Sequence, residues 1–335
     1  MKNVEFFLLI LHSSLFTFHS TLLVLWRGVG GEAFHSSFFI LHSSFFMSSL
    51  KEIKSRIASI KSTQKITSAM RMIASAKLHR TQNMTENFLR YKEQLRMILD
   101  DLGCANIDEE PLELEQKKNH SVLLIPISSN SGLCGAFNSN LSKATFKRIS
   151  ELKSEGTDVQ LVPIGKKIVH ELKKESIPCQ LDYAKTVETL EKGDPFEAVS
   201  QLTRYVLSEY KQGSIGRVEF IFHHFKSMGS QVVTVKELPL EPPRVGKTDE
   251  DNPFLTEPTA EELINSIHPR LLNAEVYGTL LDSFTSEHAA RMLAMQTADD
   301  NANELLKELT LLYNKTRQQA ITNELIDIMG GKVDK

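Results

Sequence analysis

The stretch that decides the fold reads SEHAARMLAMQTADDNANELLKELTLLYNKTRQQAITNELIDIMGG and runs from Ser286 to Gly331. It contains no proline, and its first glycine is Gly330. Apolar residues return every three or four positions, which is the period of a helix with one buried face. No cysteine pair, histidine cluster or phosphate-binding loop accompanies the pattern. The stretch therefore predicts a helix far longer than those of a compact core, with no chemistry of its own.

The same helix extends upstream of this stretch. Thr259-Ala-Glu-Glu262 has the form of a capping box that begins it, and Pro269 is where a kink is expected. Its predicted apolar stripe consists of Leu271, Val276, Leu280, Phe284, Met292, Met295, Ala298, Ala302, Leu305, Leu309, Leu312, Ile321, Leu325 and Ile328.

A second long helix is predicted near the other end of the chain. From Ser48 the sequence has no glycine or proline until Gly103. Apolar residues in its first turns are three or four positions apart, and Met70, Ile73 and Leu78 continue the pattern less regularly. About 55 residues at 1.5 Å each make a rod of roughly 80 Å. Because neither rod can bury its stripe alone, the two are predicted to pair as an antiparallel coiled coil.

The segment between the two rods has the pattern of a small α/β domain. Short apolar runs alternate with helical patterns, which indicates a largely parallel sheet. Strands are predicted at 121–127, 158–164, 217–225 and 230–238, and helices at 139–154, 166–174 and 196–211. We therefore expect residues 47–118 and 255–335 to form the coiled coil, and residues 119–254 to form the α/β domain with its linker.

Residues 1–46 differ in composition from the rest, and the unit LHSS occurs at Leu11–Ser14 and again at Leu41–Ser44. Three interpretations stay open: a secretory signal, a membrane anchor, or a misplaced start with translation beginning at Met47. The repeats favour the start at Met47. Gly28-x-Gly30-x-x-Ala33 matches a loose dinucleotide fingerprint, but no βαβ pattern follows it, so it is rejected.

Composition excludes several classes of protein. The chain has 335 residues, of which 41% are hydrophobic and 24% charged, and its net charge of −3 gives no general affinity for polyanions. Cys104, Cys134 and Cys179 are far apart and odd in number. This usage indicates free thiols in a reducing compartment and no metal or redox motif.

The loop Ser128–Asn138 lies between a predicted strand and a predicted helix, where doubly wound folds bind phosphate. A nucleotide site and a tight turn are the two interpretations. The Gly132-x-x-Gly135 spacing is weak, no GxxxxGK[ST] motif occurs, and no basic residue lies between Ser121 and Leu141. The tight turn is favoured, and we expect neither a cofactor nor a catalytic residue here.

Two other groupings of reactive residues are weaker. His223 and His224 with Cys179 could suggest a metal, but adjacent strand residues point to opposite faces. Ser286, His288 and Asp299 or Asp300 could suggest a hydrolase triad; on one helix they span up to four turns, without a nucleophile elbow. Ordinary structural roles are favoured, and no metal is expected.

The first long helix is strongly basic. Met47 to Arg80 holds eight Lys or Arg against one acid, Glu52. It could bind nucleic acid, although it lacks aromatic residues for stacking, or it could be a rod surrounded by acidic protein surfaces. The residues alone leave these alternatives open. The basic positions of this shaft include Lys51, Lys54, Lys61, Lys65, Arg71 and Lys77.

Three motifs resolve the choice by resemblance. LKEIKSRIASIKSTQKITSAMRMIASAKLHR (Leu50–Arg80) resembles the N-terminal helix of the gamma subunit family of F-type ATP synthases. SGLCGAFN (Ser131–Asn138) resembles its central motif, and Ser286–Gly331 resembles its C-terminal signature. The resemblance covers about 47–335. It departs where Asn130-Ser131 replaces an acidic-basic pair, and where Gln319 replaces an alanine.

The resemblance implies a left-handed antiparallel coiled coil beside a Rossmann-like domain, and a rotor that holds no nucleotide site. Its implied partners are a ring of alpha and beta subunits, the epsilon subunit and the membrane c-ring. Nucleic acid and a small-molecule substrate are not expected. Its implied location is the cytoplasmic face of the bacterial inner membrane, as a peripheral protein, with the coupling ion left open. The implied rotor–stator contacts are Met70, Arg317, Gln318, Thr322 and Glu324.

Overall fold

The computed structural model describes residues 49–102, 121–179, 195–242 and 257–330. The predictions for residues 1–46 and for Cys104 lie outside these ranges, as do parts of the predicted segments 47–118, 119–254 and 255–335. The described residues form two compact units, which are treated separately. Residues 49–60 and 305–330 make the smaller unit, and the described residues between 61 and 304 make the larger one.

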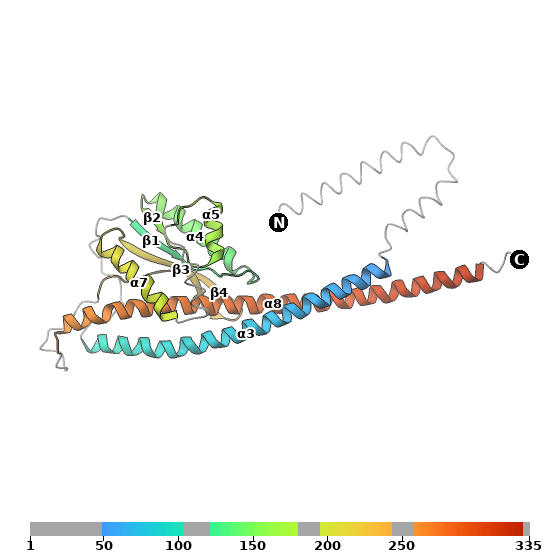
Figure 1. Ribbon diagram of the computed structural model, residues 1–335, viewed down its shortest axis with the longest axis horizontal. Coiled ribbons are helices and arrows are strands. Elements are labelled where there is room, and N and C mark those ends of the chain that lie inside the picture. The colour runs from blue at the N-terminus through green and yellow to red at the C-terminus, as the bar shows by residue number, and fades with distance from the viewer. Residues whose placement is uncertain (1–48, 103–120, 180–194, 243–256, 331–335) are drawn as a thin grey trace, which may run out of the picture. The chain divides into compact units, whose positions relative to one another are not determined.

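Two long helices, α3 (Leu50–Asp101) and α8 (Ala260–Gly330), contribute to both units (Figure 1). α3 begins at Leu50 because the Ser49 hydroxyl accepts the backbone N–H of Glu52 at 3.2 Å. α8 begins in the same way, since Thr259 Oγ1 accepts the N–H of Glu262 at 3.4 Å. This bond is one half of the predicted capping box. Pro269 lies inside α8 and does not end it.

The two helices run antiparallel in the larger unit. Gln64 donates to Asn303 at 2.7 Å, and Lys92 Nζ lies 2.6 Å from Glu275 Oε1. The two contacts on α3 are separated by the same number of residues as their two partners on α8, which run in the opposite direction. The register between the helices therefore does not change along this length. The predicted antiparallel pairing is confirmed.

The buried face of each helix repeats every seven residues. On α3 the buried or half-buried positions include 53, 60, 67, 74, 81, 88 and 95, and Leu102 just after the helix continues the series. On α8 they recur with alternating steps of four and three residues from 260 to 320, and include 288, 295, 302, 309 and 316. A seven-residue repeat is the period of a left-handed coiled coil.

Part of the predicted stripe is wrong. The side chains of Ile73 on α3, and of Leu305, Leu312, Ile321, Leu325 and Ile328 on α8, are exposed. The seam instead uses smaller or polar residues such as Ala74, Thr316 and Ala320. In the smaller unit, α3 begins at Leu50 and offers no described turn that could cover α8 beyond Ala320. The apolar residues after that point are therefore exposed.

The sheet of the larger unit has the strand order β2-β1-β3-β4 (Figure 1). Its strands are β1 (Ser121–Pro126), β2 (Asp158–Leu161), β3 (Arg217–Ser227) and β4 (Ser230–Glu237). β1 is parallel to β2 and to β3, whereas β4 returns antiparallel to β3. The sheet is therefore mixed, with the predicted parallel part at its centre.

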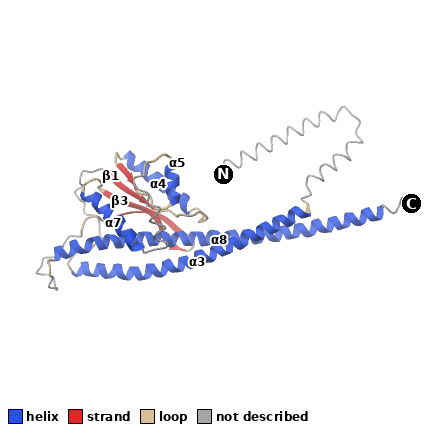
Figure 2. Cartoon of the chain, in the orientation of Figure 1, coloured by secondary structure: helices blue, strands red, loops and turns tan. Residues whose placement is uncertain are grey.

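Helices cover both faces of this sheet, which gives three layers (Figure 2). One face packs residues of α4 (Phe137–Ser154) and α5 (Lys166–Lys174) against Leu124 and Ile221. The other face packs α7 (Pro195–Lys211) and α8 against the sheet. Leu272, Val276 and Leu280 of α8 belong to that core. α8 is thus a structural part of the α/β domain as well as of the coiled coil.

Candidate functional site

The loop after β1 is held by its own polar atoms. Ser128 Oγ accepts the N–H of Ile168 at 3.0 Å, and the Ser129 carbonyl accepts the N–H of Lys167 at 3.2 Å. Asn130 Oδ1 accepts the N–H of Lys166 at 3.1 Å. These three bonds tie the loop to the start of α5. At the start of α4, the helix that follows the loop, the Phe137 N–H is bonded to the Cys134 carbonyl at 3.3 Å. This geometry favours the tight turn over the nucleotide site.

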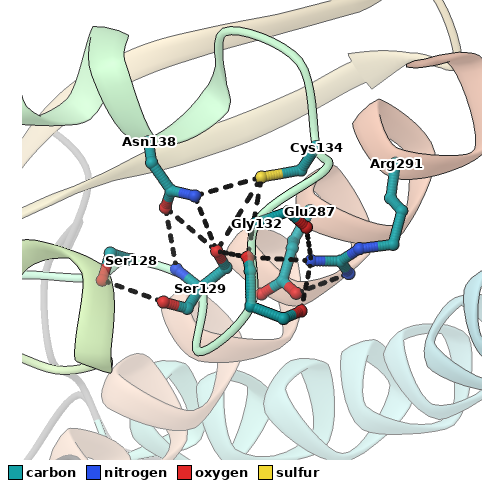
Figure 3. Close-up of polar contacts among 8 residues, drawn as sticks. Ser128, Ser129, Gly132, Cys134, Asn138, Glu287 and Arg291 are labelled. Atoms are coloured by element: carbon teal, nitrogen blue, oxygen red, sulfur yellow. Dashed lines mark hydrogen bonds and ion pairs between the residues drawn. The ribbon is translucent and has the colours of Figure 1, made fainter.

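A second set of bonds closes the loop on itself (Figure 3). Asn138 Oδ1 accepts the Ser129 backbone N–H at 3.1 Å, and Asn138 Nδ2 donates to Cys134 Sγ at 3.1 Å. Cys134 is buried and its thiol is free. Leu133, at the tip of the loop, has a φ of 64°, a conformation that residues with a side chain seldom adopt. The loop is a rigid element rather than an open cradle.

Arg291 joins this loop to α8 (Figure 3). Its Nη1 lies 2.7 Å from Glu287 Oε1, and its Nη2 donates to Ser131 Oγ at 2.9 Å and to the Gly132 carbonyl at 3.4 Å. The Glu287 side chain is almost fully buried. A guanidinium that satisfies both a carboxylate and the loop's acceptors fixes the loop against one turn of the helix.

Two more polar contacts attach α8 to β3. Ser286 Oγ donates to the His223 carbonyl at 2.9 Å. Asp282 accepts the backbone N–H of Phe225 at 2.8 Å and lies 2.6 Å from His224 Nδ1. Both α8 residues lie on consecutive turns of the helix face that packs on the sheet. Together with Arg291 they attach three successive turns of α8 to the α/β domain.

Two buried histidines flank these contacts. His223 stacks on Phe137 with ring centroids 4.0 Å apart, and burial lowers its pKa to about 4. His288 lies on the seam of α8; burial first, and then the charges of Lys77 and Arg291, lower its pKa to about 3. Neither nitrogen of His223 has a hydrogen-bond partner among the described residues. Both imidazoles are therefore neutral at neutral pH.

The two groupings of reactive residues that sequence analysis considered and disfavoured are not assembled. His223 is buried, whereas His224 bonds to Asp282 and is half exposed. Ser286 bonds to a backbone carbonyl rather than to His288. Over the described part of the chain, no group of three His, Cys, Asp or Glu residues could hold a metal ion.

The predicted rotor–stator residues lie on the two long helices. Arg317, Gln318, Thr322 and Glu324 are exposed on α8 in the smaller unit, and the Thr322 hydroxyl donates to the Gln318 carbonyl at 2.9 Å. Met70 is half buried on α3 in the larger unit. The four exposed side chains are available to another protein.

The basic shaft residues all lie on α3. Lys51, Lys54, Lys61, Lys65 and Lys77 are exposed, and Arg71 is half buried and donates to Gln296 of α8. Arg71 therefore joins the two helices in addition to carrying charge. Within the described residues, no helix combines the length and the apolar character that crossing a membrane requires.

Sequence reasoning missed the residues that join the domain to α8. Asp282, Glu287 and Arg291 were not singled out, and Ser286 was considered only as a nucleophile. One signal was available: Glu287 and Arg291 are four residues apart, which is the spacing of an ion pair on a helix. Their partners in the loop and on β3 could not be read from spacing, because they are far away in the sequence.

Comparisons with known proteins agree with this architecture. The family model described as ATP synthase matches residues 49–333. The ATP synthase gamma chain of Parabacteroides distasonis is 48% identical over 286 residues, which cover 85% of this chain and 98% of that protein. The gamma chain of Bacteroides thetaiotaomicron is 42% identical over 301 residues, covering 86% and 100% of the two chains.

Solved structures show the same fold. A chain from the Euglena gracilis mitochondrial ATP synthase in rotational state 3, a structure of OSCP, F1 and the c-ring, is similar with a TM-score of 0.58 and 20% identity. The likeness covers 85% of this chain and 93% of that one. A chain from the rotor of the same enzyme in rotational state 1 has a TM-score of 0.52. From the family match and the identity of nearly full-length relatives, the chain belongs to the ATP synthase gamma chain family.

Proposed function

We propose that this chain is the shaft that couples rotation of a membrane c-ring to the nucleotide sites of a ring of alpha and beta subunits. As a gamma chain it is a non-catalytic rotor subunit. The observation that carries the detailed proposal is α8 itself. One uninterrupted helix contributes Leu272, Val276 and Leu280 to the core of the α/β domain and continues to Gly330.

A shaft must resist twisting, and the pairing of α3 with α8 supports this role. In the larger unit their side chains bond at Gln64–Asn303 and at Arg71–Gln296. A single helix bends and frays, whereas two helices with a constant register share the load through many packed layers. We assign residues 47–118 and 255–335 to this shaft, and residues 119–254 to the α/β domain that receives the force.

The end of α8 is proposed to contact the stator ring. Arg317, Gln318, Thr322 and Glu324 provide exposed polar groups for the catalytic subunits. The same end of α8 carries exposed apolar side chains, which are in contact with water unless another protein covers them. They are Ile321, Leu325, Ile326, Ile328 and Met329. Exposed apolar residues gathered in this way are typical of a surface that another protein covers. Met70 is proposed as a further contact, on α3.

The basic residues of α3 are proposed to face acidic loops of the stator. Lys51, Lys54, Lys61 and Lys65 are exposed, so their attraction to such loops is screened by water and salt. Screened contacts are individually weak, and a rotor can exchange one for the next as it turns. Lys77 and Arg71 extend the same charge along the helix.

The proposed partners and location follow from the relatives. The likeness to chains of complexes that contain F1 and a c-ring supports assembly with alpha, beta and epsilon subunits and with the c-ring. The similar gamma chains are bacterial, which supports a peripheral position on the cytoplasmic face of the inner membrane. No nucleic acid and no small-molecule substrate of its own is proposed.

Purification from the native organism tests this function. A tagged chain should co-purify with alpha and beta subunits and with the c-ring, in a complex that hydrolyses ATP. A chain that instead purifies without these subunits, and that shifts DNA or RNA in a salt-sensitive manner, would support the nucleic-acid alternative and refute the rotor.

A further inference from the structure

Glu275 lies where three parts of the larger unit meet. It projects from α8, and its side chain is 9% exposed. One carboxylate oxygen lies 2.6 Å from Lys92 Nζ of α3, and the other lies 2.7 Å from Lys236 Nζ of β4. Each oxygen thus holds a lysine from a different element. Through this carboxylate, α8 is bonded on one side to α3 and on the other side to β4, the edge strand of the sheet.

The surroundings of this carboxylate are closely packed. The Phe88 ring of α3 meets Tyr277 of α8 edge-on at 4.9 Å. A Cβ placed on Gly278 would lie 3.1 Å from the Phe88 ring, so the two helices nearly touch at this level. Burial would raise the pKa of Glu275, but the two lysines outweigh it and hold the pKa below its ordinary value. The group is therefore charged at neutral pH.

Stability alone does not require this arrangement. Buried ionic groups can often be replaced by apolar residues of similar size without loss of stability. The hydrophobic effect is not directional, however, and it does not by itself select one relative orientation of two elements. The carboxylate is directional, since its two oxygens hold lysines from two different elements. A rotation of α8 relative to the sheet or to α3 breaks at least one bond.

We propose that Lys92, Glu275 and Lys236 are a positioning cluster that fixes the angular register of the α/β domain on the two shaft helices. Torque that enters through the domain then reaches the shaft without slip. This inference rests on the proposed coupling function, because slip has a consequence only in a rotating complex.

The test uses the complete complex reconstituted in lipid vesicles, with ATP hydrolysis and ATP-driven proton uptake measured on the same vesicles. Glu275→Gln keeps the size of the side chain and removes its charge. It should lower proton uptake per ATP hydrolysed by about two-fold or more, while hydrolysis continues. The matched control is Glu197→Gln, which removes an exposed ion pair to Arg204 on α7. The control should retain the wild-type ratio.

A second variant separates positioning from stability. Lys92→Met, Glu275→Met and Lys236→Met together remove every charge, so that no ion is left buried without a partner. The isolated triple variant should unfold in urea at least as late as the wild type, and its complex should still show the lowered ratio. If Glu275→Gln does not assemble, the triple variant decides the question.

The outcomes are separable. Uptake per ATP at the wild-type value in the assembled triple variant, or in Glu275→Gln, would overturn the positioning cluster and leave the rotor intact. A wild-type complex that hydrolyses ATP and drives uptake of neither protons nor sodium ions would instead refute the proposed coupling function. If Glu197→Gln lowered the uptake per ATP hydrolysed as much as Glu275→Gln does, the effect would not be specific to the cluster, and the proposal would be overturned.

Discussion

At the scale of single residues, the polar side chains of α8 form two sets, which differ in whether they are bonded to the rest of the chain. Those on the face toward the sheet, such as Asp282, Ser286 and Arg291, are bonded to the α/β domain. Those in the smaller unit, such as Arg317 and Gln318, are exposed. A hydrogen bond to a charged group contributes about 1.5–3 kcal/mol when it is shielded from water, and an exposed ion pair about 0–1 kcal/mol. The exposed side chains of the smaller unit can therefore contribute appreciable free energy only where another protein shields them from water.

Replacing Arg317 and Gln318 together with alanine tests this division. The isolated chain should stay folded, because neither side chain is buried. Assembly or ATPase activity of the complex should fall several-fold, because the proposed contacts with the beta subunits would be lost. The matched control is Arg204→Ala with Gln201→Ala, the same residue types exposed on α7. A double variant at 317 and 318 with unchanged yield, turnover and proton pumping would place these residues on an idle surface.

Gly165 tests the packing of the loop against the sheet. Its φ is 99°, and a Cβ there would lie 2.2 Å from the Ser128 carbonyl oxygen. Gly165→Ala should therefore lower the free energy of unfolding by about 3 kcal/mol, through overpacking and strain. Gly156 also has a positive φ but has open space around it, so Gly156→Ala should cost only about 1 kcal/mol. Urea denaturation of the two variants should show this order, and equal losses would contradict it.

At the scale of elements, the sequence predicted the two long helices well and their seam poorly. Long runs without glycine or proline identify a helix without knowledge of its partner, and both predicted rods are present. The seam was assigned to the largest apolar residues, including Ile73, Leu312 and Ile321, which are exposed. The true seam needs small side chains where the helices approach closely, and this depends on the partner helix.

The α/β domain shows the same limit. Its strands and helices were predicted to within a few residues, because apolar runs and turn signals are local. The bonds that Arg291 and Asp282 make with the loop and with β3 were not predicted, because they join residues far apart in the chain. Local patterns fix elements, whereas the joints between them depend on the fold.

The buried histidines predict how the packed elements respond to acid. His223 and His288 have pKa values lowered to about 4 and about 3, against an ordinary 6.5. Below pH 6.5 the unfolded chain binds protons that the folded chain does not, so the free energy of unfolding falls as the pH falls. Most of the loss contributed by Glu275, whose pKa lies below its ordinary value of 4.5, comes at lower pH than the window from 6.5 to 4.5.

His288→Gln should therefore flatten the loss of stability between pH 6.5 and 4.5, whatever its effect at neutral pH. The measurement is a series of urea unfolding curves across this range. His170→Gln is the matched control, since the His170 imidazole is exposed on α5. A slope in His288→Gln that equals the wild-type slope would show that the buried imidazole does not carry the effect.

At the scale of the whole molecule, the chain supplies motion rather than chemistry. The loop that follows β1 is closed by the bonds of Asn138 to Ser129 and Cys134, and residues 128–138 include no basic side chain. The isolated chain should therefore bind no nucleotide with useful affinity and hydrolyse none. Titration calorimetry with MgATP checks this, and binding in the sub-millimolar range would show that the loop opens to accept phosphate.

The central claim is that the chain turns inside its complex. A cysteine in place of the exposed Met228, on the hairpin between β3 and β4, can carry a visible probe in a background that lacks the three native cysteines. With the alpha and beta ring fixed to a surface, ATP should drive stepwise rotation of the probe in one direction, and rotation should stop when ATP is removed. A complex that hydrolyses ATP at full rate while the probe stays still would contradict the account.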